Sequence, residues 1–343
     1  MAGTLFRKSL KGFCILPRGR REWTWTERGL MNNLLRLIGR RLIAFPIMII
    51  GVSFLVFFLM SFSPVDEAYA ALGESATIEQ VQAYHKQYGL DDPLPVRYGR
   101  YMNNFFHGDL GTYGVNRASV ADRIALALPV TLQLTFIGLL IGAIVSFILG
   151  VIAALYRDKW PDQLLRVFSI AALATPSFWL GVMLILMFLG KLPVSGPLPP
   201  FGTAGYWGRM LLPAIALATP LTGQMIRIVR TSMVEELDRD YVRTARAAGI
   251  PYATIVSRNV LRNALITPVT TLGMKIGYLM GGAVVIEVVF NLPGMGMTLL
   301  AGVQGNIPTL VQGVTTVVAI AFIVINIVVD MLYLLINPRI RSV

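Results

Sequence analysis

Long apolar stretches dominate the chain and alternate with short polar segments. A helix needs ~20 apolar residues to cross a bilayer, and several stretches approach that length. They are Leu42–Phe62, Pro129–Leu155, Val167–Leu189, Met210–Ile226, Pro268–Phe290 and Gln312–Ile336. The pattern predicts an all-α integral membrane protein with six transmembrane helices, of which Met210–Ile226 is the shortest.

The polar segments between these stretches differ in character. The segment 63–128 has helical periodicity over Ile78–Tyr88 and Val96–Phe106, which predicts a small ordered cap rather than a linker. Gly190–Arg209 is rich in Pro and Gly, and we expect no regular structure there. After the fifth stretch, the P-G-M-G sequence precedes a short apolar run, Met297–Val303, which predicts a short helix.

One polar, arginine-rich segment, 232–267, interrupts the membrane-like pattern near the middle of the chain. Ser232 and Glu235 match an S-x-x-E capping box, which predicts that a helix begins there. Gly249 fits the residue after a helix end, and Pro251 fits the start of a second helix.

The first of these helices is predicted to be amphipathic. Its apolar stripe consists of Val234, Leu237, Tyr241, Ala245 and Ala248. Its opposite side carries Arg239, Arg243 and Arg246. One face is therefore expected to pack on the protein, and the other is left for water, lipid headgroups or an acidic partner.

The composition, 55% hydrophobic and 14% charged, fits a membrane protein, but the net charge of +12 also raises nucleic-acid binding. The placement of the charges decides between these classes. With the N-terminus inside, 22 of the 30 Lys and Arg residues fall in inner segments and 7 in outer ones. The positive-inside rule then predicts that both termini are cytoplasmic, and nucleic-acid binding is not expected.

Residues 1–33 read as a basic cytoplasmic extension, and 1–30 are poorly periodic. The apolar patch at Phe13–Leu16 is too short for a signal-peptide core or a span. We expect this extension to be disordered or to lie on the cytoplasmic surface. The single cysteine, Cys14, excludes an intrachain disulfide.

Motifs for nucleotide, metal or nucleophile chemistry are absent from the sequence. It contains no G-x-x-x-x-G-K-[ST], no G-x-S-x-G and no His/Cys cluster, so no metal site or cofactor is expected. His85 and His107 stand alone and read as surface or structural residues. Within or at the ends of the spans, the charged residues are Lys275, Glu287 and Asp330. This scarcity favours a translocator over a membrane-embedded enzyme.

Lys275 and Asp330 are each placed about 10 Å into the membrane from the same side by their distance from the span ends. We expect them either to pair, or share a wet cavity, near the cytoplasmic side, or to act separately, with Lys275 reaching the headgroups and Asp330 bonding a neighbouring helix. Gly273, Gly277 and Gly281 form a G-x-x-x-G-x-x-x-G face. That face fits a partner contact or the pathway lining, and equally fits packing within the chain.

The polar segment carries two motifs, R-T-A-R-A-A-G from Arg243 and R-N-A-L-I-T-P ending at Pro268, that resemble the "EAA" loop of the inner-membrane permeases of ABC importers. The resemblance is greatest to the dipeptide, oligopeptide and nickel subgroup and extends over roughly residues 34–341. Further matching motifs occur in family order: G-L-D-D-P, G-D-L-G, L-P-V-T-L, L-P-V-S-G, G-G-A-V-V-I-E-V-V-F-N-L-P-G-M-G and V-D-M-L-Y-L-L-I-N-P-R-I-R. The loop departs from the subgroup at Ala248, at Asn259 and by one extra residue before Pro268.

The resemblance implies a six-span type I importer permease of a prokaryotic inner or plasma membrane, with residues 34–341 as the permease domain. Its implied partners are a second, similar but not identical permease, two cytosolic ATPase subunits and an extracytoplasmic solute-binding protein. ATP hydrolysis would reside on the ATPases, and the binding protein would do most of the selecting, with peptides as the expected substrate class. A stand-alone secondary transporter is the alternative, although no internal repeat is evident.

In such permeases the EAA loop docks on the ATPase and couples ATP closure to rocking of the two halves. Carried onto this sequence, the implied coupling residues are Asp240, Tyr241, Arg243, Thr244, Ala245, Arg246, Ala247, Gly249, Arg262 and Pro268. The candidates for helix packing or the pathway are Gly273, Gly277, Gly281 and Glu287.

Overall fold

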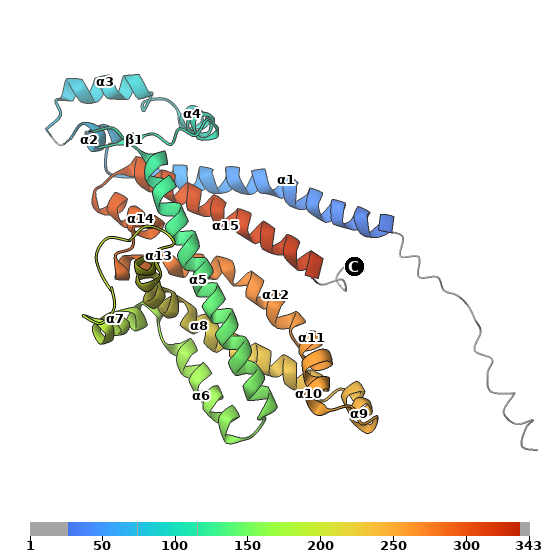
Figure 1. Ribbon diagram of the computed structural model, residues 1–343. Helices are drawn as coiled ribbons and strands as arrows, with labels where there is room; N and C mark the ends of the chain where they lie inside the picture. Colours follow the sequence, from blue (N-terminus) through green and yellow to red (C-terminus); the bar gives the residue numbers. More distant parts are fainter. Residues whose placement is uncertain (1–26, 74, 115, 337–343) are drawn as a thin grey trace, which may run out of the picture.

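In the computed structural model, the backbone is described for residues 27–73, 75–114 and 116–336, and their side chains except those of 27–38, 40–42, 330 and 332–336. Long helices make up most of this part, and a small cap lies across one end of them (Figure 1). Four helices are long and apolar enough to cross a membrane, and the number of spans is six when each of two bent helix pairs is counted as one span. The predicted all-α fold with six spans is therefore confirmed.

The four unbroken candidate spans are longer than the hydropathy pattern predicts. They are α1 (Glu27–Met60), α5 (Val120–Leu155), α8 (Ala204–Leu237) and α15 (Pro308–Ile336). Of the predicted N-terminal extension, residues 27–33 belong to the first turns of α1, so this part is not disordered, and residues 1–26 lie outside the described part. The unstructured loop predicted to reach Arg209 ends earlier, because the hydroxyl of Thr203 accepts a hydrogen bond from the N–H of Tyr206 and begins α8.

The third predicted span is not one straight helix. It consists of α6 (Trp160–Ala174) and α7 (Ser177–Phe188), which are bent by 101° relative to each other. The break falls at Thr175 and Pro176, where Thr175 adopts an extended conformation with ψ of 120°. Proline lacks the N–H of a helical bond and disfavours a helical residue before it, which explains the break.

The fifth predicted span is also broken, by 47°, between α12 (Ile266–Met274) and α13 (Ile276–Phe290). At the junction the N–H of Lys275 bonds the carbonyl of Leu272, three residues back, so the last turn of α12 is tightened. Beyond α13, the predicted short helix is confirmed as α14 (Met295–Gln304).

The cap consists of α2 (Glu67–Leu72), α3 (Ile78–Tyr88), α4 (Leu94–Phe106) and a two-stranded antiparallel sheet, β1 (Thr112–Tyr113) and β2 (Ala118–Ser119). Both predicted cap helices are confirmed. A capping box of Thr77 and Gln80 begins α3. The hydroxyl of Tyr98 donates to the carbonyl of Ile50 at 3.0 Å, which ties the cap to α1.

A line of small residues on α5 lets its backbone lie close to α8. Gly138, Gly142, Ser146 and Gly150 are all buried and recur every four residues. A Cβ at Gly150 would lie 2.6 Å from the Cβ of Val229 on α8, and one at Gly142 would lie 2.9 Å from Leu221. Small residues at this spacing allow close helix packing in membranes.

The polar segment forms α9 (Asp240–Ala247), α10 (Tyr252–Thr254), a π-helix η1 (Ile255–Val260) and α11 (Leu261–Ala264). The prediction that a helix begins at Ser232 is wrong, because α8 continues through it to Leu237. Met225, Val229 and Met233 are buried at helical spacing, so packing carries α8 past the apparent capping box. The following helix begins only at Asp240, after a break at Asp238 and Arg239.

Candidate functional site

The α9 helix lies at the end of the protein opposite the cap (Figure 1). Val242 is its buried anchor, with a relative exposure of 1%. It belongs to an apolar cluster with Met233 of α8, Ile255 of η1 and Ala264 of α11. The short helix is thus held on a hydrophobic base that α8 and the η1–α11 segment build together.

The end of α9 is a Schellman motif. The N–H of Ile250 bonds the carbonyl of Ala245 at 3.2 Å, and the N–H of Gly249 bonds that of Arg246 at 3.0 Å. Gly249 has φ of +79° and open space around the position of a Cβ. This confirms the predicted helix end at Gly249, and Pro251 directly precedes α10 as predicted.

The outward face of α9 is cationic. Arg239, Arg243 and Arg246 are exposed, as the amphipathic pattern predicts. The guanidinium of Arg246 lies 4.5 Å from the ring centre of Tyr252, a cation–π geometry that orients it. Arg239 makes an ion pair of 3.6 Å with Glu236. Ala248, which the sequence pattern placed on the apolar stripe, is exposed, so that part of the prediction is wrong.

The remaining predicted coupling residues lie around this helix in different settings. Asp240 is in the first turn of α9, where its carbonyl accepts the hydroxyl of Thr244 at 3.0 Å. Tyr241 is half-buried and donates to Glu236 at 3.0 Å. The side chains that the structure brings together on α9 are Asp240, Tyr241, Arg243, Thr244, Ala245, Arg246 and Ala247. Arg262 is exposed on α11, and Pro268 is buried in α12.

The glycines of the fifth span do not share one environment. A Cβ at Gly273 would lie 2.9 Å from Val329, and one at Gly277 would lie 2.6 Å from Phe322, so both face α15. Gly281 has nothing within 4 Å of its Cβ position. The structure therefore places Gly273 and Gly277 in a close helix contact within the chain and leaves Gly281 open.

Of the two charges predicted to lie within the membrane, the structure describes the side chain of Lys275 only. Lys275 is at the α12–α13 junction, with Nζ 5.9 Å from the ring centre of Tyr278. Asp330 belongs to the backbone of α15, but its side chain lies outside the described part. Their pairing stays a prediction.

A buried arginine was missed by the sequence pattern, which assigned Arg209 to an outer loop. Its relative exposure is 1%, and its guanidinium donates to the carbonyls of Val194 at 2.5 Å and Phe290 at 2.6 Å. It thereby joins the loop before α8 to the end of α13. A charge count sees only that Arg209 is charged, so no local signal could have found this role.

Comparison with known proteins identifies the family. Residues 146–342 match the family model described as the binding-protein-dependent transport system inner membrane component, and residues 34–135 match the model of its N-terminal part. A probable D,D-dipeptide transport system permease protein, DdpB of Escherichia coli K12, is 37% identical over 319 residues, covering 86% of this chain and 94% of its own length. The glutathione transport system permease protein GsiC of the same strain is 37% identical over 311 residues, covering 90% and 99%.

These matches include the motifs at both ends of the fold, from the cap helices to α15. They give no support to a stand-alone secondary transporter or to an enzyme, because the matched proteins are membrane components of ABC importers, in which separate subunits hydrolyse ATP. The chain belongs to the family of binding-protein-dependent transport permeases and is a type I ABC importer permease of the peptide and nickel subgroup.

Proposed function

We propose that this permease imports di- or oligopeptides, or a related small solute, as one half of a pathway that it forms with a second, non-identical permease. Two ABC ATPases drive the cycle from the cytoplasm, and an extracytoplasmic binding protein delivers the solute. The names of its relatives support this substrate class: DdpB is a probable D,D-dipeptide permease, and GsiC is a glutathione permease.

The α9 helix is the proposed contact with the ATPase, and its geometry is the observation that carries this proposal. A coupling element must be rigid, end sharply and present a surface to its partner. Val242 anchors α9, Gly249 ends it, and Arg243 and Arg246 project from it. This cationic face is complementary to an acidic cleft.

The experiment reverses one charge on this face. Arg243→Glu should weaken co-purification of the ATPase subunits and lower solute uptake, because a repulsive charge then faces the proposed acidic cleft. Arg123→Glu is the matched control, since Arg123 is also exposed but lies on α5 at the cap end. Normal uptake and normal ATPase binding by Arg243→Glu would remove α9 from the contact.

We also propose that the cap is extracytoplasmic and that α9 and both termini are cytoplasmic. The lysine and arginine distribution supports this orientation. After replacement of Cys14, single cysteines are placed at Ser75 in the cap and Ser257 in η1, both of which are exposed. A membrane-impermeant thiol reagent added to whole cells should label position 75 only, and labelling of position 257 alone would reverse the orientation.

The substrate is tested on the cognate binding protein, which sets selectivity in this proposal. Calorimetry with a series of dipeptides, tripeptides, glutathione and nickel complexes should give the tightest binding for a peptide. Uptake of that solute should then require the permease. Tight binding of a nickel complex and of no peptide would change the substrate class but leave the coupling role intact.

A further inference from the structure

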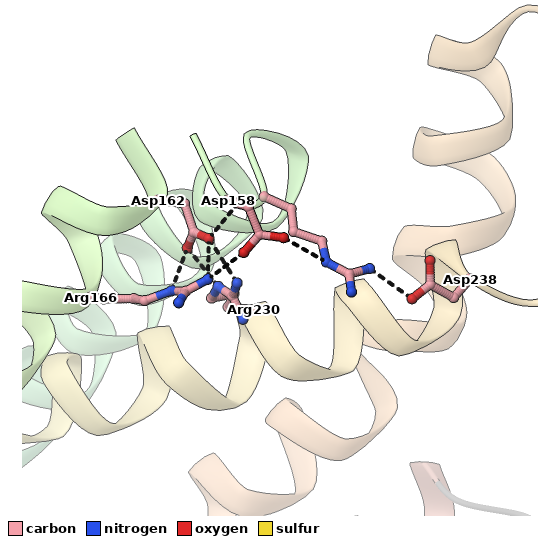
Figure 2. Close-up of polar contacts among 6 residues, drawn as sticks. Asp158, Asp162, Arg166, Arg230 and Asp238 are labelled. Atoms are coloured by element: carbon pink, nitrogen blue, oxygen red, sulfur yellow. Dashed lines mark hydrogen bonds and ion pairs between the residues drawn. The ribbon is translucent and has the colours of Figure 1, made fainter. Parts of the chain in front are cut away.

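Six charged residues form one connected network at the α9 end of the protein (Figure 2). Its centre is Asp162 in the first turn of α6, whose side chain has a relative exposure of 0%. Arg230 of α8 binds it with two hydrogen bonds, from Nε to Oδ1 at 2.6 Å and from Nη2 to Oδ2 at 2.7 Å. A two-bond contact of this kind fixes orientation as well as distance.

The buried carboxylate is fully engaged by further donors. Arg166, one turn along α6, donates to Asp162 Oδ2 at 2.7 Å, and the backbone N–H of Asp158 donates to the same oxygen at 2.9 Å. Asp158 lies at the α5–α6 corner and has φ of +62°, a conformation that non-glycine residues seldom adopt. In this conformation its N–H reaches the carboxylate of Asp162. The corner, α6 and α8 are therefore held on one carboxylate.

A second branch of the network, the outer arm, runs from Arg166 through Asp158 and Arg157 to Asp238, just before α9. Arg166 also bonds Asp158 at 3.0 Å, Asp158 lies 3.4 Å from Arg157, and Arg157 donates to Asp238 at 2.8 Å. Asp238 is the C-cap residue of α8, two residues before α9 begins. The members are three arginines and three aspartates: Arg157, Arg166, Arg230, Asp158, Asp162 and Asp238.

Backbone packing reinforces the same connection. A Cβ at Gly223 of α8 would lie 2.5 Å from the carbonyl oxygen of Ser169 on α6, and one at Gly150 of α5 would lie 2.6 Å from Val229 of α8. Helices that touch this closely do not slide or separate without losing the contact. The network thus joins α5, α6 and α8 to one another at the end of the protein that carries α9.

We propose that Asp162 and Arg230 are positioning residues for coupling: they make the α5–α6 corner and the α8–α9 junction move as one rigid body when the ATPases act on α9. This inference rests on the proposed coupling role of α9. The close contact at Gly223 keeps α6 against α8, and the network fixes the ends of these two helices that lie nearest α9. Motion of α9 is then passed to α6 and to the bent α6–α7 pair as well as to α8.

The first test joins the two sides of the arm covalently. Arg157→Cys and Asp238→Cys are combined in a chain with Cys14 replaced, in the complete importer, and bridged with a bifunctional thiol reagent as long as an arginine side chain. If the two segments move as one body, bridged and unbridged importers take up solute equally. Loss of uptake on bridging, with normal uptake before it, shows relative motion and overturns the proposal.

The second test removes the central charge and compares uptake with ATP hydrolysis in proteoliposomes. Asp162→Asn should lower solute moved per ATP hydrolysed by about fivefold or more, the range of allosteric coupling, while ATPase subunits remain bound. A purely structural defect would lower uptake and ATP hydrolysis together. The matched control is Asp122→Asn, which removes an exposed carboxylate from the first turn of α5.

Arg243→Glu is run in the same assay to separate the two proposals. If it impairs uptake and Asp162→Asn does not, the network is not needed and only this inference fails. If neither affects uptake, the coupling role of α9 fails as well. Should Asp162→Asn not assemble, the bridging experiment, which keeps Asp162, decides the question.

Discussion

Glu287 on α13 accepts a hydrogen bond of 2.7 Å from the backbone N–H of Gly296 on α14. Both residues are buried, and the contact places a carboxylate at the start of α14, where backbone N–H groups have no partner within the helix. The N–H of Met295 is satisfied separately, by the hydroxyl of Thr131 on α5 at 2.9 Å. The first turn of α14 is thus held by side chains from two candidate spans.

This contact leaves no room at Gly294. Its φ of −98° suits any residue, but a Cβ there would overlap the carboxylate of Glu287. We therefore expect Gly294→Ala to destabilise the protein by about 1–3 kcal/mol, the usual cost of overpacking. Gly281→Ala is the control, because nothing lies within 4 Å of that Cβ position. Thermal unfolding in detergent is the measurement, and equal unfolding temperatures for the two variants would contradict the geometry.

The end of α9 can be tested through the conformation of Gly249. Its φ of +79° costs a side chain with a Cβ roughly 1 kcal/mol or more, and a β-branched residue suffers most. Gly249→Val should leave the protein inserted but uncouple transport from ATP hydrolysis, whereas Gly249→Asn should be nearly normal because asparagine tolerates this region. Uptake and ATPase activity are measured side by side, and full uptake by Gly249→Val would count against the coupling role.

The cap contains a histidine whose charge affects stability. His85 Nε2 lies 2.9 Å from both carboxylate oxygens of Asp66, and Nδ1 lies 3.4 Å from Asp91. The hydrogen bond with Asp66 is the main cause that raises the pKa of His85, and burial opposes it. A raised pKa in the folded state means that the protonated form stabilises the cap.

We expect this stabilisation to be complete below the unfolded pKa of about 6.5 and to disappear as the pH rises through the higher folded value. It should amount to about 1 kcal/mol or less, since the pair is partly exposed. Limited proteolysis of the cap across this pH range is the measurement. His85→Gln should abolish the pH dependence, and His107→Gln, whose ring bonds the carbonyl of Asn103, should retain it.

Lys275 and Asp330 remain a pair to be tested by a double-mutant cycle. Breaking a desolvated ion pair from one side costs roughly 3–5 kcal/mol, and removing both charges costs less. Lys275→Met with Asp330→Leu should therefore be less damaging than the two single losses added together, measured by thermal stability in detergent. If the stability losses of the two single variants simply add up in the double variant, Lys275 does not interact with Asp330, and its contact is with the ring of Tyr278.

Hydropathy located the spans but not their breaks. Thr175 and Pro176 lie in a strongly apolar stretch, so an average over the stretch conceals a 101° bend that proline chemistry explains locally. Ser232 shows the opposite error. Its capping pattern is a local rule, and the burial of Met233 against distant helices overrides it. Cap helices were predicted well, because α3 has both an amphipathic pattern and its own capping box.

The candidate site was predictable where local rules apply. Gly249 was found from the glycine–proline spacing, and the exposed arginines were found from helical periodicity. The anchoring of α9 and the network of Asp162 were not, because both depend on residues far along the chain. Arg230 lies 68 residues from Asp162 in the sequence, and nothing in the residues around Arg230 indicates that Asp162 is its partner.

The close contact of α5 and α8 also determines where a solute cannot travel. From Gly138 to Gly150, three positions have no space even for a methyl group without a shift of the facing side chain. No opening between these two helices exists in this conformation. A solute path therefore does not pass between α5 and α8 over this stretch.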